Sequence, residues 1–331
     1  MQDPLVSVHM ITYNHEPFIR KAIDCVLAQK TTFPFDLVIG EDCSTDGTRE
    51  IVFDYAKRYP DIIRVITSEQ NVGAKKNSKR TNQACLGKYI AFCEGDDYWH
   101  HPDKLQKQVA YMEIHPECGL IHSDYHRNNV KDGSLIKDFN KTMNNLPPEN
   151  LNMTSILRGG RYLYILTCTV MARKCLINKV THSDPALYQS NRFLLGDTSL
   201  WAEIANISKT HYINESLSTY NVLPISASKN LDPIKQQIFG KSVSEMCLYL
   251  VKKHKLSSSE YAYHLNKWCS NALPLAFYTR DKALAISAKQ ANKRLSIKNA
   301  LFFYGTVNNF VYAILIYIIN IKKKMLNKFA P

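Results

Sequence analysis

The most informative segment of this sequence is Ile90-Ala91-Phe92-Cys93-Glu94-Gly95-Asp96-Asp97-Tyr98-Trp99. An apolar run typical of a buried strand ends abruptly in three carboxylates, and Gly95 allows a close backbone approach. Carboxylates crowded at the end of a buried strand repel one another and resist losing water unless a cation lies among them. Oxygen ligands suit Mg²⁺ or Mn²⁺, which commonly carry a phosphate. The stretch predicts a metal and phosphate site, and the alternative is a solvated acidic turn.

Strands and helices are expected to alternate around this stretch. The expected strands are residues 6–12, 35–40, 62–66, 89–93 and 119–123. The expected helices are 16–29, one following Thr48, 77–86 and 102–115; residues 162–171 also resemble a strand, and 131–152 a loop or lid. This alternation predicts an α/β fold with a doubly wound, mainly parallel sheet that binds ligands beyond the carboxyl ends of its strands.

Polar residues follow three of these expected strands, namely Thr12-Tyr13, Glu41-Asp42 and residues 94–97. The first strand lacks a GxGxxG loop and the chain lacks GxxxxGK[ST], which argues against a dinucleotide fold and a P-loop. A nucleotide could still bind by stacking its base on Tyr13 and donating to Asp42, with the metal holding its diphosphate.

Composition and charge narrow the class of protein. The 331 residues are 45% hydrophobic and 21% charged, as in ordinary globular proteins. The nine cysteines form no CxxC pair, which indicates reduced thiols in the cytosol, and no signal-peptide pattern precedes the apolar run that begins at Val6. Of the net charge of +13, residues 241–331 carry +12, with 15 Lys and Arg against three acids. We therefore expect a cytoplasmic protein with a polyanionic partner, which could be an anionic membrane surface, a phosphorylated substrate or a nucleic acid.

Three motifs in this order resemble the family 2 glycosyltransferases: residues 6–14, residues 40–48, and residues 87–90 leading into 94–99. The resemblance covers about residues 4–225. It implies a GT-A fold and an inverting, metal-dependent enzyme. It also implies nucleoside contacts for Thr12, Tyr13 and Asp42, a place near the ribose and metal for Asp96, and metal ligation for Asp97. Glu94 stands where the family has Asp, so it is either a further metal ligand or a residue that holds the loop.

Two further residues are candidates for the site. Arg80, between the second and third motifs, could reach the base or the diphosphate, or be an ordinary solvated arginine. Asp197 follows an apolar run and Gly196, at the position that supplies the catalytic base in the resembled family. A carboxylate there could take the acceptor proton, and it could equally cap the helix that follows. Asp184 competes for the base role but precedes a proline in turn chemistry.

We expect residues 1–228 to form the catalytic domain and residues 229–331 to form a basic helical module. Its segment 299–321 contains no charged residue and is followed by Lys322, Lys323 and Lys324. The segment could lie in a membrane interface, pack as a core helix or span the bilayer, and we expect the interfacial arrangement.

The prediction is a glycosyltransferase attached peripherally to the inner face of the cell membrane, with Mn²⁺ or Mg²⁺ as cofactor. It would move a hexose from a UDP-sugar to a polyprenyl-diphosphate-linked saccharide in bacterial surface polysaccharide (O-antigen or capsule) synthesis. One rival is a metal-dependent nucleotidyltransferase, which usually has a Gly-rich basic loop that Thr12 to His15 lacks. Another is a non-catalytic membrane-associated partner. The acidic clusters argue against a nucleic-acid partner.

Overall fold

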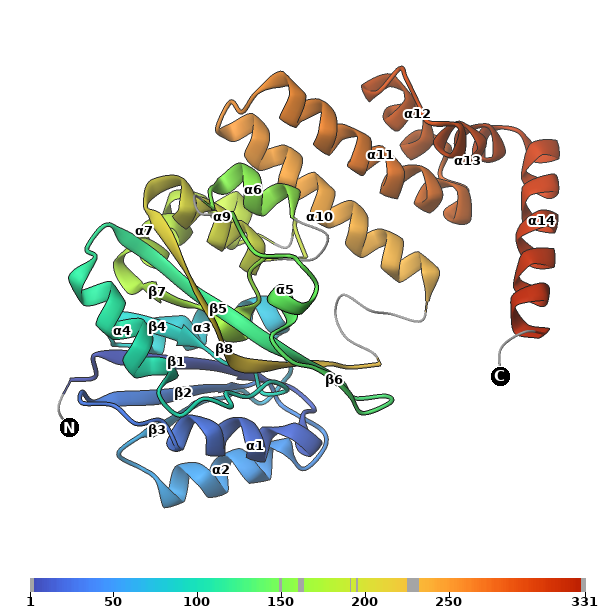
Figure 1. Cartoon of the computed structure of the whole chain (residues 1–331). Helices are drawn as coiled ribbons and strands as arrows, with labels where there is room; N and C mark the ends of the chain where they lie inside the picture. Colours follow the sequence, from blue (N-terminus) through green and yellow to red (C-terminus); the bar gives the residue numbers. More distant parts are fainter. Residues whose placement is uncertain are drawn as a thin grey trace. The chain divides into compact units, whose positions relative to one another are not determined.

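The computed structural model describes residues 3–148, 151–159, 164–190, 192–194, 196–224 and 232–328, the last seven as backbone only. The chain forms two compact units, one of residues 1–189 with 196–224 and the other of residues 190–195 with 225–331. Each unit is described by itself (Figure 1).

The first unit is built on one eight-stranded sheet with the order β3-β2-β1-β4-β7-β5-β6, in which β8 pairs with β5. The strands are β1 Val6–Thr12, β2 Phe35–Glu41, β3 Ile63–Ile66, β4 Tyr89–Phe92, β5 Cys118–Asn129, β6 Ser134–Ile136, β7 Met171–Arg173 and β8 Lys209–Val222. β1 to β4 are mutually parallel where they pair, β8 is parallel to β5, and β7 is antiparallel to both β4 and β5. The predicted α/β fold with a mainly parallel sheet is therefore confirmed.

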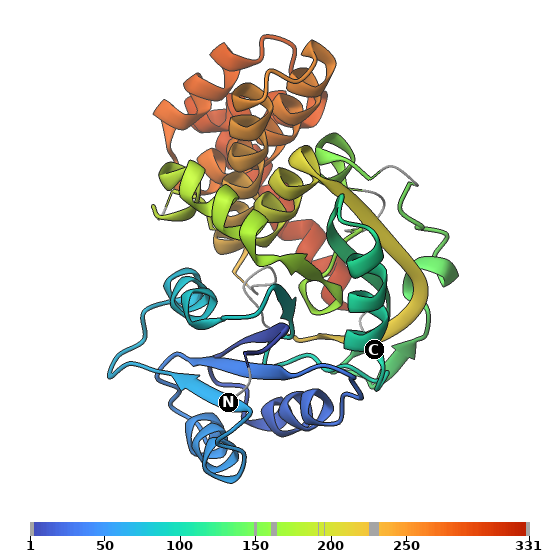
Figure 2. The same ribbon diagram turned by 90° about the vertical axis from the view of Figure 1, so that its left-hand side faces the viewer.

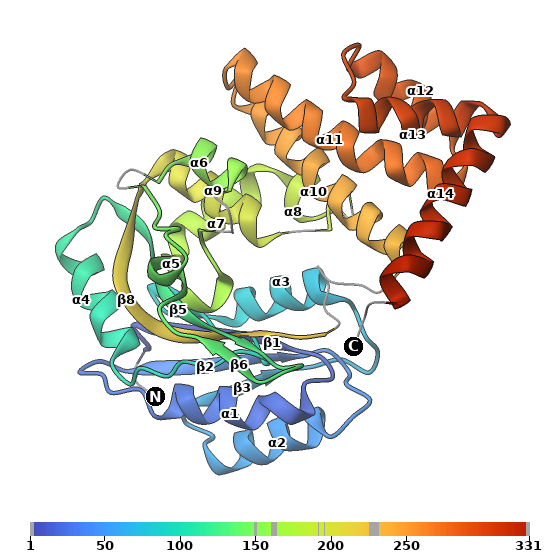
Figure 3. The same cartoon turned by 45° about the vertical axis from the view of Figure 1, so that its right-hand side comes forward.

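Helices cover both faces of this sheet (Figures 2 and 3). They are α1 Glu16–Leu27, α2 Thr48–Arg58, α3 Ala74–Ala84, α4 Lys104–Ile114, α5 Phe139–Thr142, α6 Met153–Arg158, α7 Lys174–Ser183, α8 Pro185–Tyr188 and α9 Asp197–Ile207. Side chains of β1 alternate between the faces, so Val8 and Met10 join the core beneath α1 and α2. His9 points to the other face, where its Nε2 donates to the Ser78 carbonyl on α3 at 3.1 Å.

Gly40 lets α3 lie directly against β2. A Cβ added at this position would lie 2.0 Å from the Thr81 hydroxyl and 2.8 Å from the Asn77 side chain, far inside van der Waals contact. The amide of Asn77 donates to the Gly40 carbonyl at 2.7 Å. The glycine thus brings the amino-terminal half of α3 to the carboxyl end of β2.

Two expectations about irregular segments need correction. In residues 162–171, expected as a strand, positions 162 and 163 lie outside the described residues, Thr167–Thr169 is a 3-10 turn, and the strand β7 begins only at Met171. The segment 131–152, expected as a loop or lid, contains β6 and α5, and positions 149 and 150 lie outside the described residues. β7 becomes a strand by pairing with β4 and β5, which lie far from it in sequence, whereas β6 forms a hairpin with the preceding strand β5.

The second unit is helical where it is described. Its helices are α10 Pro233–Lys253, α11 Ser258–Thr279, α12 Lys282–Ala291, α13 Ile297–Val307 and α14 Asn309–Lys328. Trp268, Leu273 and Ala276 of α11 pack with Ala285 and Ala288 of α12 in its core. The apolar segment 299–321 is two helices that meet at Asn308, and no described helix is both long and apolar enough to cross a bilayer.

Candidate active site

The carboxyl ends of β2, β1 and β4 lie side by side and carry the predicted polar residues. The Asp42 amide donates to the Thr12 carbonyl at 3.1 Å, which joins the ends of β2 and β1. The Gly95 amide donates to the Ile11 carbonyl at 3.0 Å, which joins the acidic loop after β4 to β1. The structure therefore brings the three predicted segments together at one edge of the parallel sheet.

Asp42 is buried and its carboxylate is held by the turn that begins α3. Its two oxygens accept from the Val72 and Gly73 amides, each at 2.9 Å. Arg80 lies 3.5 Å from the same carboxylate and donates to the Glu41 carbonyl at 2.7 Å. Arg80 is thus a fixed, half-buried residue, not an ordinary solvated one. Tyr13 leaves 42% of its surface exposed beside this edge of the sheet, which suits a ring that receives a flat ligand.

Gly95 lets the acidic loop approach the end of β1. A Cβ at this position would lie 2.6 Å from the Thr12 hydroxyl and 3.0 Å from Nδ1 of His15. Nδ1 of His15 is 3.3 Å from the Thr12 hydroxyl, and its Nε2 is 3.9 Å from the carboxylate of Asp96. A row of side chains therefore runs from the strand through the imidazole to the acidic loop.

The two adjacent aspartates differ in their surroundings. Asp97 is buried; one of its oxygens accepts from the Asn221 amide at 2.8 Å, and the Cys168 thiol also hydrogen-bonds to it. The Asn221 side chain donates to the Asp96 carbonyl at 2.6 Å. Asp96 keeps about a fifth of its side chain exposed, since its relative exposure is 22%. The loop is consequently anchored through Asp97 to β8 and presents the Asp96 carboxylate to the site.

Negative charge accumulates in this loop. Burial and the neighbouring carboxylates of Asp96 and Asp197 raise the pKa of Glu94 to about 8. Burial, Asp96 and Glu94 likewise raise the pKa of Asp97 above its ordinary range. Among the described residues no three His, Cys, Asp or Glu side chains form a complete metal cage. The residues do fit Mg²⁺ or Mn²⁺ as such ions bind with nucleotides, through one or two carboxylates and the substrate phosphates, with Asp96 and Glu94 as the carboxylates.

Asp197 lies close enough to the acidic loop that its charge adds to burial and to Asp96 in raising the pKa of Glu94. It is the first residue of α9, and Trp201, one turn further along, packs edge-on against Phe92 of β4 with ring centroids 5.1 Å apart. Its oxygens accept from the Thr198 amide at 2.6 Å and from the Thr167 hydroxyl at 3.2 Å. The expected helix is present, and Gly196 occupies the N-cap position. A half-buried carboxylate so placed can accept a proton from a hydroxyl bound beside it.

The competing carboxylate, Asp184, is buried and caps the short helix α8. Its side chain accepts from the Leu187 amide at 3.0 Å. This is a structural use of the side chain, typical of an N-cap aspartate.

Sequence reasoning missed three residues that shape the site: His15, Cys168 and Asn221. His15 carried a usable signal, because it comes three residues after the end of β1, beside the polar pair Thr12-Tyr13. Cys168 and Asn221 carried none, because their partner Asp97 is 71 and 124 positions away.

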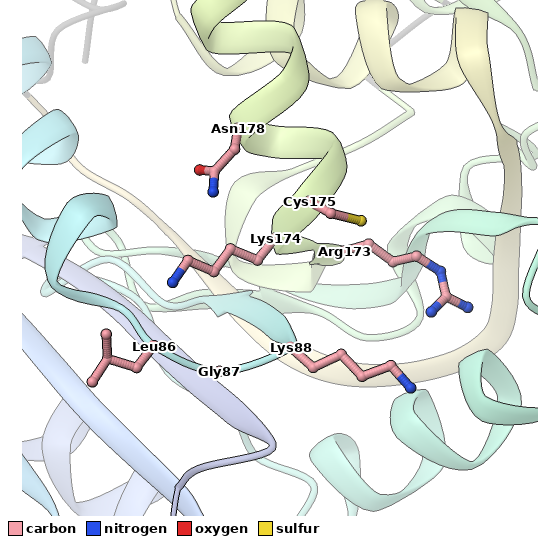
Figure 4. Close-up of a pocket in the computed structure, with 7 residues that line it drawn as sticks. All are labelled: Leu86, Gly87, Lys88, Arg173, Lys174, Cys175 and Asn178. Carbon is pink, nitrogen blue, oxygen red and sulfur yellow. The ribbon is translucent and has the colours of Figure 1, made fainter.

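A shallow pocket lies at the other edge of the sheet, before β4 (Figure 4). Lys88 there binds Glu113 at 2.8 Å, and the Arg173 guanidinium donates to the carbonyls of Cys118 and Met112. Lys88 and Arg173 are therefore both engaged by other groups of the protein. None of the predicted site residues lines this pocket.

Comparison with curated proteins found relatives that include named bacterial glycosyltransferases. An uncharacterised protein of Mycobacterium bovis is 47% identical over 112 residues, 34% of this chain and 32% of that protein, so the chain covers about a third of that relative. TuaG of Bacillus subtilis, named for a glycosyltransferase role in teichuronic acid biosynthesis, is 30% identical over 69% of this chain and 82% of its own length. WfgD of Escherichia coli, a UDP-Glc:alpha-D-GlcNAc-diphosphoundecaprenol beta-1,3-glucosyltransferase, is 30% identical over 70% of this chain and 82% of its own length.

Solved structures share the fold. TarS 1–349 of S. aureus, in complex with UDP-GlcNAc, superposes with a TM-score of 0.54 at 16% identity over 92% of this chain and 80% of its own. The mannosyltransferase PcManGT of Pyrobaculum calidifontis, with GDP-Man and Mn²⁺, gives 0.54 at 15% identity over 94% of this chain and 86% of its own. The expected GT-A fold is thereby confirmed.

Sequence comparison identifies the family of the chain. Residues 7–176, about half of the chain, match the profile described as Glycosyl transferase family 2, and they contain all of β1 except its first residue, Asp42 and the whole acidic loop. With relatives such as TuaG and WfgD aligned over two thirds of its length, the chain belongs to glycosyl transferase family 2.

Proposed function

We propose that this glycosyltransferase moves a hexose from a UDP-sugar to a saccharide linked to a lipid diphosphate, with inversion at the anomeric carbon. The proposal rests on three groups around the carboxyl ends of the parallel strands, with Asp197 close enough to the acidic loop to add to burial and Asp96 in raising the pKa of Glu94. These are the fixed carboxylate of Asp42, the partly exposed Asp96 of the acidic loop, and Asp197 at the start of α9. The first suits a nucleoside, the second a diphosphate with its metal, and the third an acceptor hydroxyl.

The nucleoside would lie against β1 and β2. Asp42 is held by two backbone amides and Arg80, so its remaining lone pairs are fixed to accept from a base N–H. The exposed ring of Tyr13 would stack on the base, and Thr12 would shape the floor beneath the sugar-phosphate. Arg80 would act here by orienting Asp42, since its own donors serve Glu41 and Asn77.

The cofactor would be Mn²⁺ or Mg²⁺, held by Asp96 with Glu94 beside it. When bound, such a cation neutralises charge that develops on the departing diphosphate. Asp97, whose oxygen already serves Asn221, would hold the loop and contribute to the metal site chiefly by fixing Asp96. Mn²⁺ in the PcManGT complex supports a divalent cation in this fold.

Asp197 would be the general base. As the acceptor oxygen bonds to the anomeric carbon, its proton passes to the Asp197 carboxylate, and the bond from that carbon to the diphosphate oxygen breaks to release UDP. Thr167 and the Thr198 amide hold the carboxylate in place. Attack opposite the leaving group inverts the configuration.

The donor and acceptor classes rest on the relatives. WfgD is named for UDP-Glc and a GlcNAc-diphosphoundecaprenol acceptor, TuaG for teichuronic acid, and TarS was solved with UDP-GlcNAc. We assign residues 1–228 to catalysis and 229–331 to a basic module that attaches the enzyme peripherally to the inner face of the cell membrane. The enzyme would act in the synthesis of a bacterial surface polysaccharide of the O-antigen or capsule type.

The test is a transfer assay with UDP-glucose or UDP-galactose, Mn²⁺ and a GlcNAc-diphosphate-lipid. We expect a β-linked product, read from the anomeric coupling by NMR, that Asp197→Asn abolishes and Asp184→Asn, which keeps a helix cap, does not. A product with retained configuration, or full turnover by Asp197→Asn, would contradict the mechanism. Sugar nucleotide formed from a triphosphate would indicate a nucleotidyltransferase, and no turnover with any donor a non-catalytic protein.

A further inference from the structure

The helices α13 and α14 each have one packed face and one exposed face. On α14 the packed side holds Tyr312, whose ring is 4.9 Å from that of Phe277 on α11 and lies beneath the Arg280 guanidinium at 4.0 Å. Gly305 of α13 admits Leu315 of α14 so closely that a Cβ at 305 would lie 2.9 Å from it. These contacts fix which side of α14 faces the solvent.

The exposed side of α14 is apolar. Phe310, Ile314, Tyr317 and Ile321 recur at the spacing of one helix face, and Phe310 and Tyr317 expose 75% and 69% of their surface. On α13 a second row of the same spacing consists of Ile297, Leu301 and Tyr304. Soluble proteins rarely expose rows of large apolar side chains without a partner. We call these two rows the apolar face.

The charge around the apolar face selects the partner. The last 50 residues contain nine Lys and Arg and no acid. Lys298 adjoins Ile297, Lys293 and Arg294 are exposed just before α13, and α14 continues through Lys322, Lys323 and Lys324. A second copy of this face would bring like charges together, whereas a surface of anionic lipid headgroups complements them.

We propose that the apolar face of α13 and α14 inserts into the interface of an anionic bilayer while the surrounding lysines contact its headgroups. Apolar aromatic side chains with a basic rim are the chemistry by which helices lie in a membrane interface without crossing it. The inference rests on the proposed function, in which residues 229–331 attach the enzyme to a membrane, and it names the side chains that make this attachment. The binding itself requires no catalysis.

The test is flotation of the full chain with vesicles of phosphatidylcholine alone and of phosphatidylcholine mixed equally with phosphatidylglycerol. We expect the wild type to float only with the anionic vesicles. The double variant Phe310→Ser/Tyr317→Ser should lower the partition coefficient by roughly 100-fold, since each large apolar side chain contributes about 1.5 kcal/mol or more when buried. Lys293→Glu/Lys298→Glu should lower it by roughly tenfold or more.

The control is Phe53→Ser/Tyr59→Ser, which removes an exposed aromatic pair, 43% and 39% exposed, from α2 and its C-cap. Its flotation should equal that of the wild type. The proposal is overturned if the wild type does not float with anionic vesicles, or if Phe310→Ser/Tyr317→Ser floats like the control Phe53→Ser/Tyr59→Ser. It is also overturned if light scattering shows a dimer that only Phe310→Ser/Tyr317→Ser dissociates. UDP binding by every variant, measured in parallel, separates this result from the proposed function, because either property can be lost while the other persists.

Discussion

Replacing Gly95 by alanine tests whether the acidic loop must touch the end of β1. The added Cβ would lie 2.6 Å from the Thr12 hydroxyl and 2.8 Å from its Cβ. Thr12 is buried in β1, whose neighbours β2 and β4 flank it on both sides, so the strand cannot yield. The loop has to move instead, and it carries Glu94 and Asp96 with it.

The size of the movement follows from ordinary contact distances. Carbon atoms approach to about 3.5–4.0 Å, so the loop must recede from β1 by about 1 Å. Overpacking of this kind costs about 1–3 kcal/mol of stability. A displacement of about 1 Å in a group that positions a substrate can cost about 100-fold in turnover. We therefore expect Gly95→Ala to remain folded, with a modestly lower free energy of unfolding and a turnover reduced about 100-fold.

The assay is UDP release from a UDP-sugar with saturating acceptor and Mn²⁺, together with urea unfolding of the same preparation. Gly196→Ala is the matched control, because an added Cβ there meets no atom of the described residues within 4 Å and its φ of −117° suits any residue. It should retain most of the turnover. Wild-type turnover by Gly95→Ala would refute the claim that the close contact of this loop with Thr12 sets the geometry of the site.

Three further predictions follow from single groups. Asp197→Asn should lower kcat by at least about 100-fold, as expected for loss of a general base, and leave UDP affinity measured by calorimetry unchanged; an equal loss of both would make Asp197 a donor-binding residue. His15→Ala should lower kcat/KM for the UDP-sugar by about tenfold at limiting Mn²⁺, because Asp96 loses its neighbour; no change would remove His15 from the site. Burial and nearby His211 lower the pKa of His122 from 6.5 to about 3, so the unfolded chain binds a proton between these values and the folded chain does not. The contribution of His122 to the free energy of unfolding should therefore be at its maximum above pH 6.5 and fall by up to about 1 kcal/mol per pH unit below it. The variant His122→Leu should flatten this pH dependence in urea titrations. Identical slopes for the wild type and the variant would contradict the lowered pKa of His122.

Most of the parallel part of the sheet could be predicted because the local sequence pattern identifies its strands. β1 and β4 are short apolar runs bounded by polar residues, and the amphipathic pattern of α1 marks which side packs on them. β7 was misjudged because three residues, Met171–Arg173, carry little pattern of their own and become a strand by pairing with β4 and β5. Tertiary pairing overrides such weak local preferences.

The candidate site was predictable in its residue types and less so in its geometry. Adjacent aspartates look alike in sequence, yet Asp97 turns into the protein toward Asn221 while Asp96 remains partly exposed. That division depends on β8, more than 100 residues downstream. The position of His15 after β1 was readable from the sequence, but its contacts with the Thr48 hydroxyl and with the acidic loop at Gly95 were not.

The most direct test of the proposed metal and nucleotide site is calorimetry of UDP binding with and without Mn²⁺. The proteins to compare are the wild type, Asp96→Ala and the exposed control Asp61→Ala. We predict that Mn²⁺ strengthens UDP binding to the wild type and to Asp61→Ala, and that Asp96→Ala loses this metal-dependent part. If UDP binds equally with Mn²⁺ and with a chelator, or if no nucleoside diphosphate binds at all, the acidic loop is a structural feature and the proposed catalytic site is wrong.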